Sequence, residues 1–86
     1  MFIPNDLLSR ITIDSNVMLG KPTICGLRIT VEQILKSLSN GISQSEILEE
    51  YPELDEKDFQ AVFAYVAILV EEEQVFPVVM NPIYKK

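Results

Sequence analysis

The chain has 86 residues, 48% of them hydrophobic, with one cysteine and no histidine. This length predicts a single domain with one small core and a thin margin of stability. A single cysteine excludes an intrachain disulfide, and no signal-peptide pattern opens the sequence, so we expect a cytoplasmic protein. The longest apolar run, residues 61–70, would span roughly 15 Å as a helix, about half of a bilayer core, and we therefore expect no membrane span.

Charge is distributed unevenly along the chain. The net charge is −6, and residues 43–86 carry three basic and ten acidic residues, whereas residues 1–42 carry four basic and three acidic ones. A nucleic-acid-binding protein usually shows a basic surface. Such a surface must therefore lie on the N-terminal half or be assembled by the pairing of two chains.

The first thirty residues predict small elements rather than long helices. Residues 1–9 predict an N-terminal arm with about one helical turn, and residues 11–14 a short strand with two apolar residues on one face. The triplet at 20–22 predicts a tight bend. Residues 23–29 predict a small hairpin turning near Gly26, since glycine supplies the positive φ of such turns, although an irregular loop fits them too.

Three helices are predicted after residue 30, over about residues 31–40, 43–51 and 55–73. Each has its own start signal, a capping box or a capping aspartate, at Thr30 with Gln33, Ser43 with Glu46, and Asp55. The residues expected to face the core follow helical spacing; they are Val31, Ile34, Leu35 and Leu38, then Ile47, Leu48 and Tyr51, then Phe59, Val62, Phe63, Val66, Leu69 and Val70.

The third predicted helix has more apolar surface than one small domain can cover. Apolar residues also occupy its other faces, and a helix that is apolar all round must be covered on several sides. We therefore predict a homodimer packed through residues 61–70, the alternative being burial under the N-terminal arm or the C-terminal tail. The candidate interface residues are Ala61, Ala64, Tyr65, Ala67 and Ile68.

Residues 74–86 predict an extended C-terminal tail, because Pro77 and Pro82 are incompatible with a helix interior. An extended apolar segment can add to a sheet edge or lie in a partner's groove. Packing back onto its own domain explains the composition equally well. The candidate residues for contact with a partner protein are Phe76, Val78, Val79, Met80 and Tyr84.

The sequence offers few groups for catalysis, and we do not expect an enzyme. Without histidine the commonest proton shuttle is missing, Cys25 has no imidazole to activate it, and a zinc site is implausible. The acidic clusters at 46–58 and 71–73 could hold a cation, but their pattern follows helix caps and solvent faces. We therefore expect no catalytic residue, metal, cofactor or small-molecule substrate.

The predicted elements combine into a mainly α domain over residues 10–73. A trihelical helix-turn-helix unit follows a short strand and a small hairpin, and one helix of such a unit can enter the DNA major groove. Helical trios also serve as plain scaffolds. The helix pattern alone is therefore weak evidence for DNA binding.

Residues 10–70 resemble the bacterial family known as domain of unknown function 433. The most specific part of the resemblance is a spaced string, Gly20-Lys21-Pro22, Ile24, Gly26 and Arg28-Ile29. It is preceded by the segment at 10–14 and continued by Val31, Ile34, Leu35, Gly41, Ser43, Glu46, Ile47, Leu48, Tyr51-Pro52, Leu54, Ala64 and Tyr65.

The resemblance implies a homeodomain-like or winged helix-turn-helix fold and the role of a VapB-type antitoxin. Such proteins are often encoded beside a PIN-like ribonuclease toxin, which they neutralise, and they repress the shared operon. No catalytic residue comes with the resemblance. This chain has Leu27 where the family commonly has threonine, and Cys25 where arginine is common. The second difference removes a cation that could contact phosphate.

Two hypotheses remain open at this point. In the first, a DNA-binding antitoxin dimer brings together the candidate phosphate contacts Arg10, Lys21, Arg28 and Lys36. Arg28 could instead pair with Asp14, which we expect. In the second, a protein-only module places its acidic half, with or without the tail, in a basic groove of the toxin, without binding DNA. A solitary enzyme is a third hypothesis without supporting residues.

Overall fold

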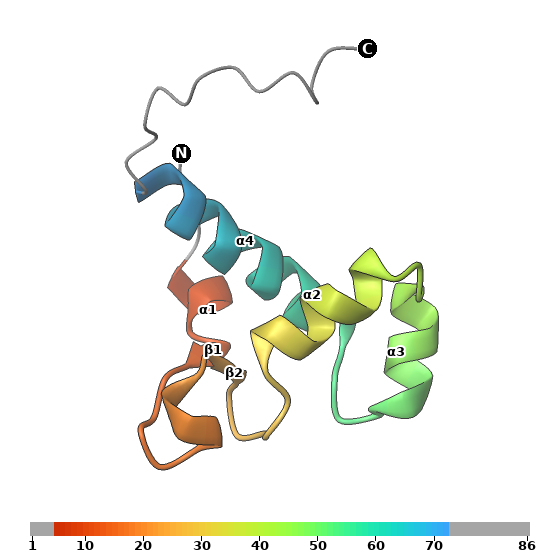
Figure 1. Ribbon diagram of the computed structural model, residues 1–86, viewed down its shortest axis with the longest axis horizontal. Helices are drawn as coiled ribbons and strands as arrows, with labels where there is room; N and C mark the ends of the chain where they lie inside the picture. The colour runs from red at the N-terminus through yellow and green to blue at the C-terminus, as the bar shows by residue number, and fades with distance from the viewer. Residues whose placement is uncertain (1–4, 73–86) are drawn as a thin grey trace.

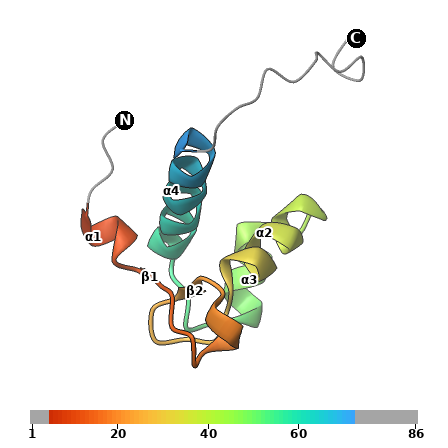
Figure 2. The same ribbon diagram turned by 60° about the vertical axis from the view of Figure 1, so that its left-hand side comes forward.

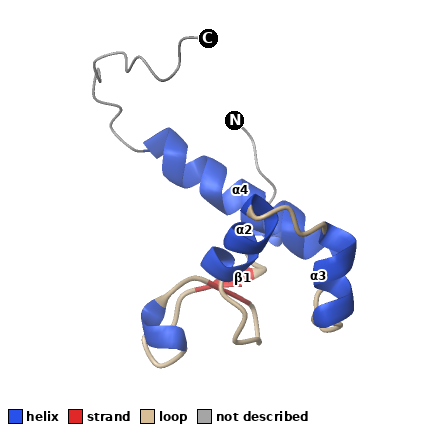
Figure 3. Ribbon diagram, turned by 45° about the vertical axis from the view of Figure 1, so that its right-hand side comes forward, coloured by secondary structure: helices blue, strands red, loops and turns tan. Residues whose placement is uncertain are grey.

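The computed structural model describes residues 5–72, so the predicted tail at 74–86 lies outside the described residues. The described part holds four helices and one two-stranded antiparallel sheet (Figures 1 and 3). It is mainly helical, as the sequence predicts. In chain order its elements are α1 (Asn5–Leu8), β1 (Ile11–Thr12), the 3-10 turn η1 (Met18–Gly20), β2 (Thr23–Ile24), α2 (Val31–Ser39), α3 (Gln44–Glu50) and α4 (Glu56–Glu72).

The sheet differs from the predicted strand and hairpin. β1 ends at Thr12 because the chain turns at Asp14, whose carboxylate accepts the N–H of Asn16 at 2.9 Å. Ile13 is consequently 62% exposed instead of facing the core. β2 pairs with β1 in the register Ile11 with Ile24. The predicted turn near Gly26 is present, with φ +80° and a hydrogen bond from Leu27 N–H to Ile24 O, but the expected second strand is reduced to a single bridge between Thr23 and Thr30.

The bend after β1 contains a left-handed turn that the sequence does not signal. Met18 and Leu19 have φ values of 49° and 60°, a region that costs an L-residue on the order of 1–2 kcal/mol. Gly20 follows at φ 80°, where glycine bears no such cost. The turn leaves the Leu19 side chain 92% exposed to solvent.

The predicted start of α2 is half confirmed, and that of α3 is fully confirmed. Thr30 accepts the N–H of Gln33 at the start of α2, but the Gln33 side chain bonds the Tyr51 hydroxyl instead of returning to the cap. At α3 both halves of the capping box form, Glu46 N–H to Ser43 Oγ and Ser43 N–H to Glu46 Oε1.

α2 ends in a Schellman motif. The N–H of Ile42 reaches the carbonyl of Ser37, and the N–H of Gly41 reaches that of Leu38. Gly41 takes the left-handed conformation, φ +86°, that this motif requires. The short connection that it permits places α3 at an angle to α2 (Figure 1).

α4 begins where Asp55 predicts it. Asp55 Oδ1 accepts the N–H groups of Lys57 and Asp58, and Asp58 Oδ2 accepts the N–H of Asp55, so the two carboxylates cap the helix reciprocally. The core lies between the first half of α4 and the strand and helix segments before it. Its buried apolar residues are Ile24, Ile29, Val31, Ile34, Ile47, Leu54, Phe59 and Val62.

The apolar stripe predicted for α4 is only half buried. Phe59 and Val62 are in the core, whereas Phe63, Leu69 and Val70 are 46%, 48% and 59% exposed. The helix is longer than the small core that covers its first half, and its C-terminal end extends past α2 and α3 (Figures 1 and 2). Helical periodicity assigns a face correctly but does not say how far along the helix the core reaches.

The N-terminal arm supplies part of the cover for α4. α1 packs against α4 (Figure 2), which is the alternative that the sequence left open. Ala61 is completely buried within the chain, so its assignment to a dimer interface is wrong. The remaining candidates, Ala64, Tyr65, Ala67 and Ile68, are half-buried, and a homodimer through them stays a prediction.

Candidate functional site

The four cations proposed as phosphate contacts do not form one open basic surface in a single chain. Arg10, Lys21 and Lys36 each lie within 4.0 Å of a carboxylate oxygen, whereas Arg28 has no hydrogen bond or ion pair with the part of the chain that the structure describes. Three of the four positive charges are therefore matched by acids of the same chain.

Arg10 joins the N-terminal segment to the start of α4. Its Nη1 lies 3.0 Å from Asp55 Oδ1 and 3.0 Å from Asp58 Oδ1. The hydrogen bonds to Asp58 and then to Asp55 raise the pKa of Arg10 above its ordinary value. Partial desolvation acts to raise the pKa of Asp55, but the hydrogen bond and charge of Arg10 and the capped N–H groups outweigh it, so that pKa lies below its usual value. This cluster is better suited to holding the fold than to holding a ligand.

Lys21 and Lys36 share one carboxylate. Lys21 Nζ lies 2.8 Å from Glu32 Oε1, and Lys36 Nζ lies 3.1 Å from Glu32 Oε2. The hydrogen bonds from Lys21 and then Lys36 hold the pKa of Glu32 below its ordinary value. All three side chains are exposed. The two lysines and one glutamate have a net charge of one positive unit, but both lysines are already paired with Glu32.

The helices that could enter a DNA groove are acidic. α2 and α3 are joined by a short turn at 40–43, and in DNA-binding helix-turn-helix proteins the second of two such helices reads the bases. α3 has no basic residue, and Glu46, Glu49 and Glu50 are exposed on it. If α3 and α4 are taken as the pair instead, the first turn of α4 exposes Glu56 beside Lys57, which cancel in charge, while Asp58 is buried. Neither arrangement supplies the positive charge that phosphate binding needs.

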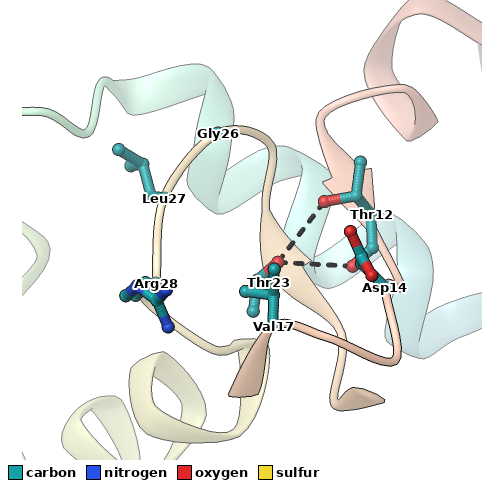
Figure 4. A pocket seen from close by; sticks show the side chains of 7 residues that line it. All are labelled: Thr12, Asp14, Val17, Thr23, Gly26, Leu27 and Arg28. Carbon is teal, nitrogen blue, oxygen red and sulfur yellow. Dashed lines mark hydrogen bonds between the residues drawn. The ribbon is translucent and has the colours of Figure 1, made fainter. Parts of the chain in front are cut away.

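Arg28 lines a cavity of about 420 Å³ next to the sheet. Figure 4 shows Arg28 on one side and Asp14 on the other, with Thr23 and Val17 between them in this view. The expected ion pair between Arg28 and Asp14 is therefore wrong. The Asp14 carboxylate instead accepts the N–H of Asn16 in its own turn. The Thr23 hydroxyl donates to the carbonyl of Thr12, and it lies 3.3 Å from the Thr12 hydroxyl. The cavity has donors and acceptors but a mixed charge, which does not favour a simple anion.

The most distinctive exposed surface lies on the second half of α4. We name it the α4 seam and define it as Phe63, Val66, Leu69 and Val70. Sequence reasoning assigned all four residues to the core and so missed the exposure of Phe63, Leu69 and Val70, whereas Val66 is half-buried and packs against the core. The seventeen-residue length of the helix in so short a chain was a signal of that exposure. Glu71 and Glu72 follow the seam and are exposed. Apolar side chains bounded by acids are suited to binding a protein surface of opposite charge.

Residues 5–72 hold no cluster of three or more His, Cys, Asp or Glu side chains that could ligate a metal ion. They also contain no helix of the length and hydropathy needed to cross a bilayer. The candidate partner residues Phe76, Val78, Val79, Met80 and Tyr84 lie outside the described residues.

Comparison with known proteins agrees with the resemblance found at residues 10–70. A family model described as "Protein of unknown function (DUF433)" matches residues 11–66. The crystal structure of a DUF433 member protein from Anabaena variabilis ATCC 29413 at 2.00 Å resolution is similar, with 25% identity and a TM-score of 0.68 over 81% of this chain and 80% of that one. No curated protein matches. The chain therefore belongs to the DUF433 family of proteins of unknown function.

Proposed function

We propose that the chain is an antitoxin-like binding protein that neutralises a PIN-like ribonuclease by contact. The proposal combines the antitoxin role implied by the sequence resemblance with the surface of the last two helices. An RNA-cleaving enzyme needs a basic groove for its substrate. An acidic surface with apolar anchors can occupy such a groove in place of RNA.

One observation carries this proposal more than any other. The exposed apolar seam of α4 ends at two exposed glutamates, and the only basic residue of α4 is Lys57, in its first turn. α3 adds exposed glutamates and no cation. The second half of the molecule is therefore acidic and apolar at once, as a binder of a basic protein should be.

The test is inhibition of a purified nuclease. We expect a PIN-like ribonuclease to be encoded beside the gene of this chain. The full chain should form a complex with it and suppress its cleavage of a single-stranded RNA substrate at equimolar concentration. Complex formation should weaken as salt rises, because opposite charges are screened. Undiminished RNA cleavage in the presence of excess folded chain would contradict the proposal.

Binding of promoter DNA is the second candidate function. The helix-turn-helix of α2 and α3 and the unmatched, exposed Arg28 favour it, while the acidic α3 opposes it. Pairing of two chains would have to supply the missing positive charge. A gel-shift assay at low salt tests this function. If the chain retards its own promoter fragment and unrelated DNA displaces that fragment poorly, the result supports specific binding. If unrelated DNA competes as well as unlabelled promoter DNA, the result opposes it.

A further inference from the structure

The α4 seam continues the line of residues that forms the core. Phe59, Val62, Val66 and Leu69 are spaced by three, four and three residues, the repeat by which one helix packs along another. Burial declines along this line: Phe59 and Val62 are buried, Val66 is half-buried, and Leu69 is about half exposed. The first half of the line thus packs against the chain's own elements, and the second half has the same pattern without comparable cover in the described residues.

The described elements leave part of the second half of α4 uncovered. α1 packs on α4, and Figures 1 and 2 show the C-terminal end of α4 beyond α2 and α3. The half-buried Ala64 and Ile68 lie on another side of the helix from Leu69, because each residue turns the helix by about 100°, which places Ile68 about 100° and Ala64 about 140° from Leu69. The exposed part of the seam is therefore a face with room for one further helix.

Electrostatics select the partner of this face. The last turn of α4 contains no basic residue, and Glu71 and Glu72 stand where the helix dipole already has its negative end. Acids at this position oppose the dipole instead of complementing it. A cation of a partner brought to this end would interact favourably with the exposed Glu72 and with the dipole.

A second copy of the chain fits this face poorly. Phe63, Leu69 and Val70 together expose roughly 300 Å² of apolar surface, so two seams would remove about 600 Å², half of the ~1,200 Å² at the lower end of stable interfaces. Each copy would also bring its own acidic end and a net charge of −6. A basic helix would cover a similar area of the seam, but it would bring opposite charge in place of a second acidic end.

We propose that the α4 seam is the docking site for a basic amphipathic helix of the partner protein. The apolar ridge of that helix would pack on Leu69, Val70 and Val66, and its cations would lie over Glu72 and the C-terminal end of α4. The inference rests on the proposed function in one respect, that the natural source of the helix is the nuclease.

A synthetic helix tests the docking site without the nuclease. The probe is a peptide of about three heptads with leucine at a and d and lysine at e and g, and its matched control has glutamate at e and g. Isothermal titration of the full chain should give salt-sensitive binding of the lysine peptide and none of the glutamate peptide. Leu69→Ser with Val70→Ser should weaken binding about tenfold or more, since two apolar contacts are lost.

A matched surface variant controls for general loss of apolar surface. Ile13→Ser with Leu19→Ser removes two side chains that are more exposed than those of the seam and lie in the loop after β1. This variant should bind the lysine peptide like the unmodified chain. Circular dichroism melts of both variants confirm that they fold. Equal weakening by the two double variants would overturn the docking site.

Inhibition of the nuclease separates this inference from the proposed function. The seam variant should lose inhibition that the loop variant keeps. If both variants inhibit fully, the proposed function stands and the docking site is overturned. If the unmodified chain does not inhibit, the proposed function fails, and the peptide titration still decides the docking site.

Two other occupants of the seam would give different results. Light scattering that shows a dimer dissociated by the seam variant would assign the face to a second copy. Methyl contacts in NMR spectra of the free chain between Leu69 or Val70 and residues 73–86 would assign it to the chain's own C-terminal segment. Either result overturns the proposal, whereas a monomer without such contacts supports it.

Discussion

Arg10 Nη1 lies 3.0 Å from Oδ1 of Asp58, a residue 48 positions further along the chain. Asp58 is buried, and its other oxygen accepts the N–H of Asp55 at the start of α4. One carboxylate thus serves as a helix cap and as the anchor for the segment before β1. A buried carboxylate needs such partners, because burial without them is costly.

Replacement of Asp58 by alanine should lower the free energy of unfolding by about 2 kcal/mol, since a reciprocal cap and a charge-assisted hydrogen bond are lost together. Urea unfolding followed by circular dichroism measures this change. Glu32→Ala is the matched control, because its ion pairs with Lys21 and Lys36 are exposed and contribute little. A variant of Asp58 as stable as the Glu32 variant would contradict the role of the buried pair.

Stability should fall in acid below about pH 4. The pKa values of Asp55, Glu32 and Glu46 lie below their ordinary values, that of Glu46 because of the Ser43 backbone N–H and then its hydroxyl. The unfolded chain then binds more protons than the folded one, so stability present above the unfolded pKa values is lost as pH falls through the folded ones.

Urea midpoints between about pH 2.5 and pH 6 test this expectation, which comes from carboxylates of ordinary unfolded pKa near 4. Arg10→Met should return the pKa of Asp55 toward its ordinary value, which an NMR titration of that carboxyl would show. The urea midpoint of this variant should then fall less steeply between about pH 6 and pH 2.5. A midpoint that stays constant down to pH 2.5 would contradict the assigned hydrogen bonds.

Gly41→Ala should destabilise the chain by about 1 kcal/mol. A Cβ at this position would meet nothing within 4 Å, so the cost comes from the left-handed φ of +86° that ends α2. Gly41→Asn should cost less, because asparagine tolerates this conformation better. Thermal melts compare the two variants, and equal effects would indicate that contacts rather than backbone conformation determine the result.

Local signals predicted the helices of this chain well. The caps at Thr30, Ser43 and Asp55 lie where the spacing placed them, because a cap is a bond between residues two or three apart. The pairing of β2 with β1 was not predicted, since the register of Ile11 with Ile24 depends on the path of the intervening loop. The left-handed Met18 and Leu19 carry no sequence signal because neither residue type favours that conformation.

The candidate site was less predictable than the fold. The sequence identifies Arg10 and Lys21 as cations, but whether a cation is available depends on which carboxylate folds beside it, and Asp55 and Glu32 do so here. The exposure of Leu69 depends likewise on where the core ends. Both properties arise from tertiary packing, which spacing along the chain does not encode.

Leu19→Asn should leave stability unchanged or raise it by up to about 0.5 kcal/mol, unlike most substitutions of leucine. The side chain is almost fully exposed, so no packing is lost, and asparagine relieves part of the cost of the left-handed backbone. Leu54→Asn is the control in the buried core and should be strongly destabilising. Comparable losses for both would place Leu19 in a contact of the folded chain.

Arg28→Ala should separate the two candidate functions. Arg28 is exposed and unmatched in the described chain, and Figure 1 places its loop at the other end of the molecule from the C-terminus of α4. The free energy of unfolding should therefore change by no more than about 0.5 kcal/mol, and the variant should still inhibit the nuclease. If the chain also binds promoter DNA, the same variant should weaken binding and reduce the slope of log affinity against log salt by about one. Lost inhibition with intact DNA binding would reverse the assignment of the two surfaces.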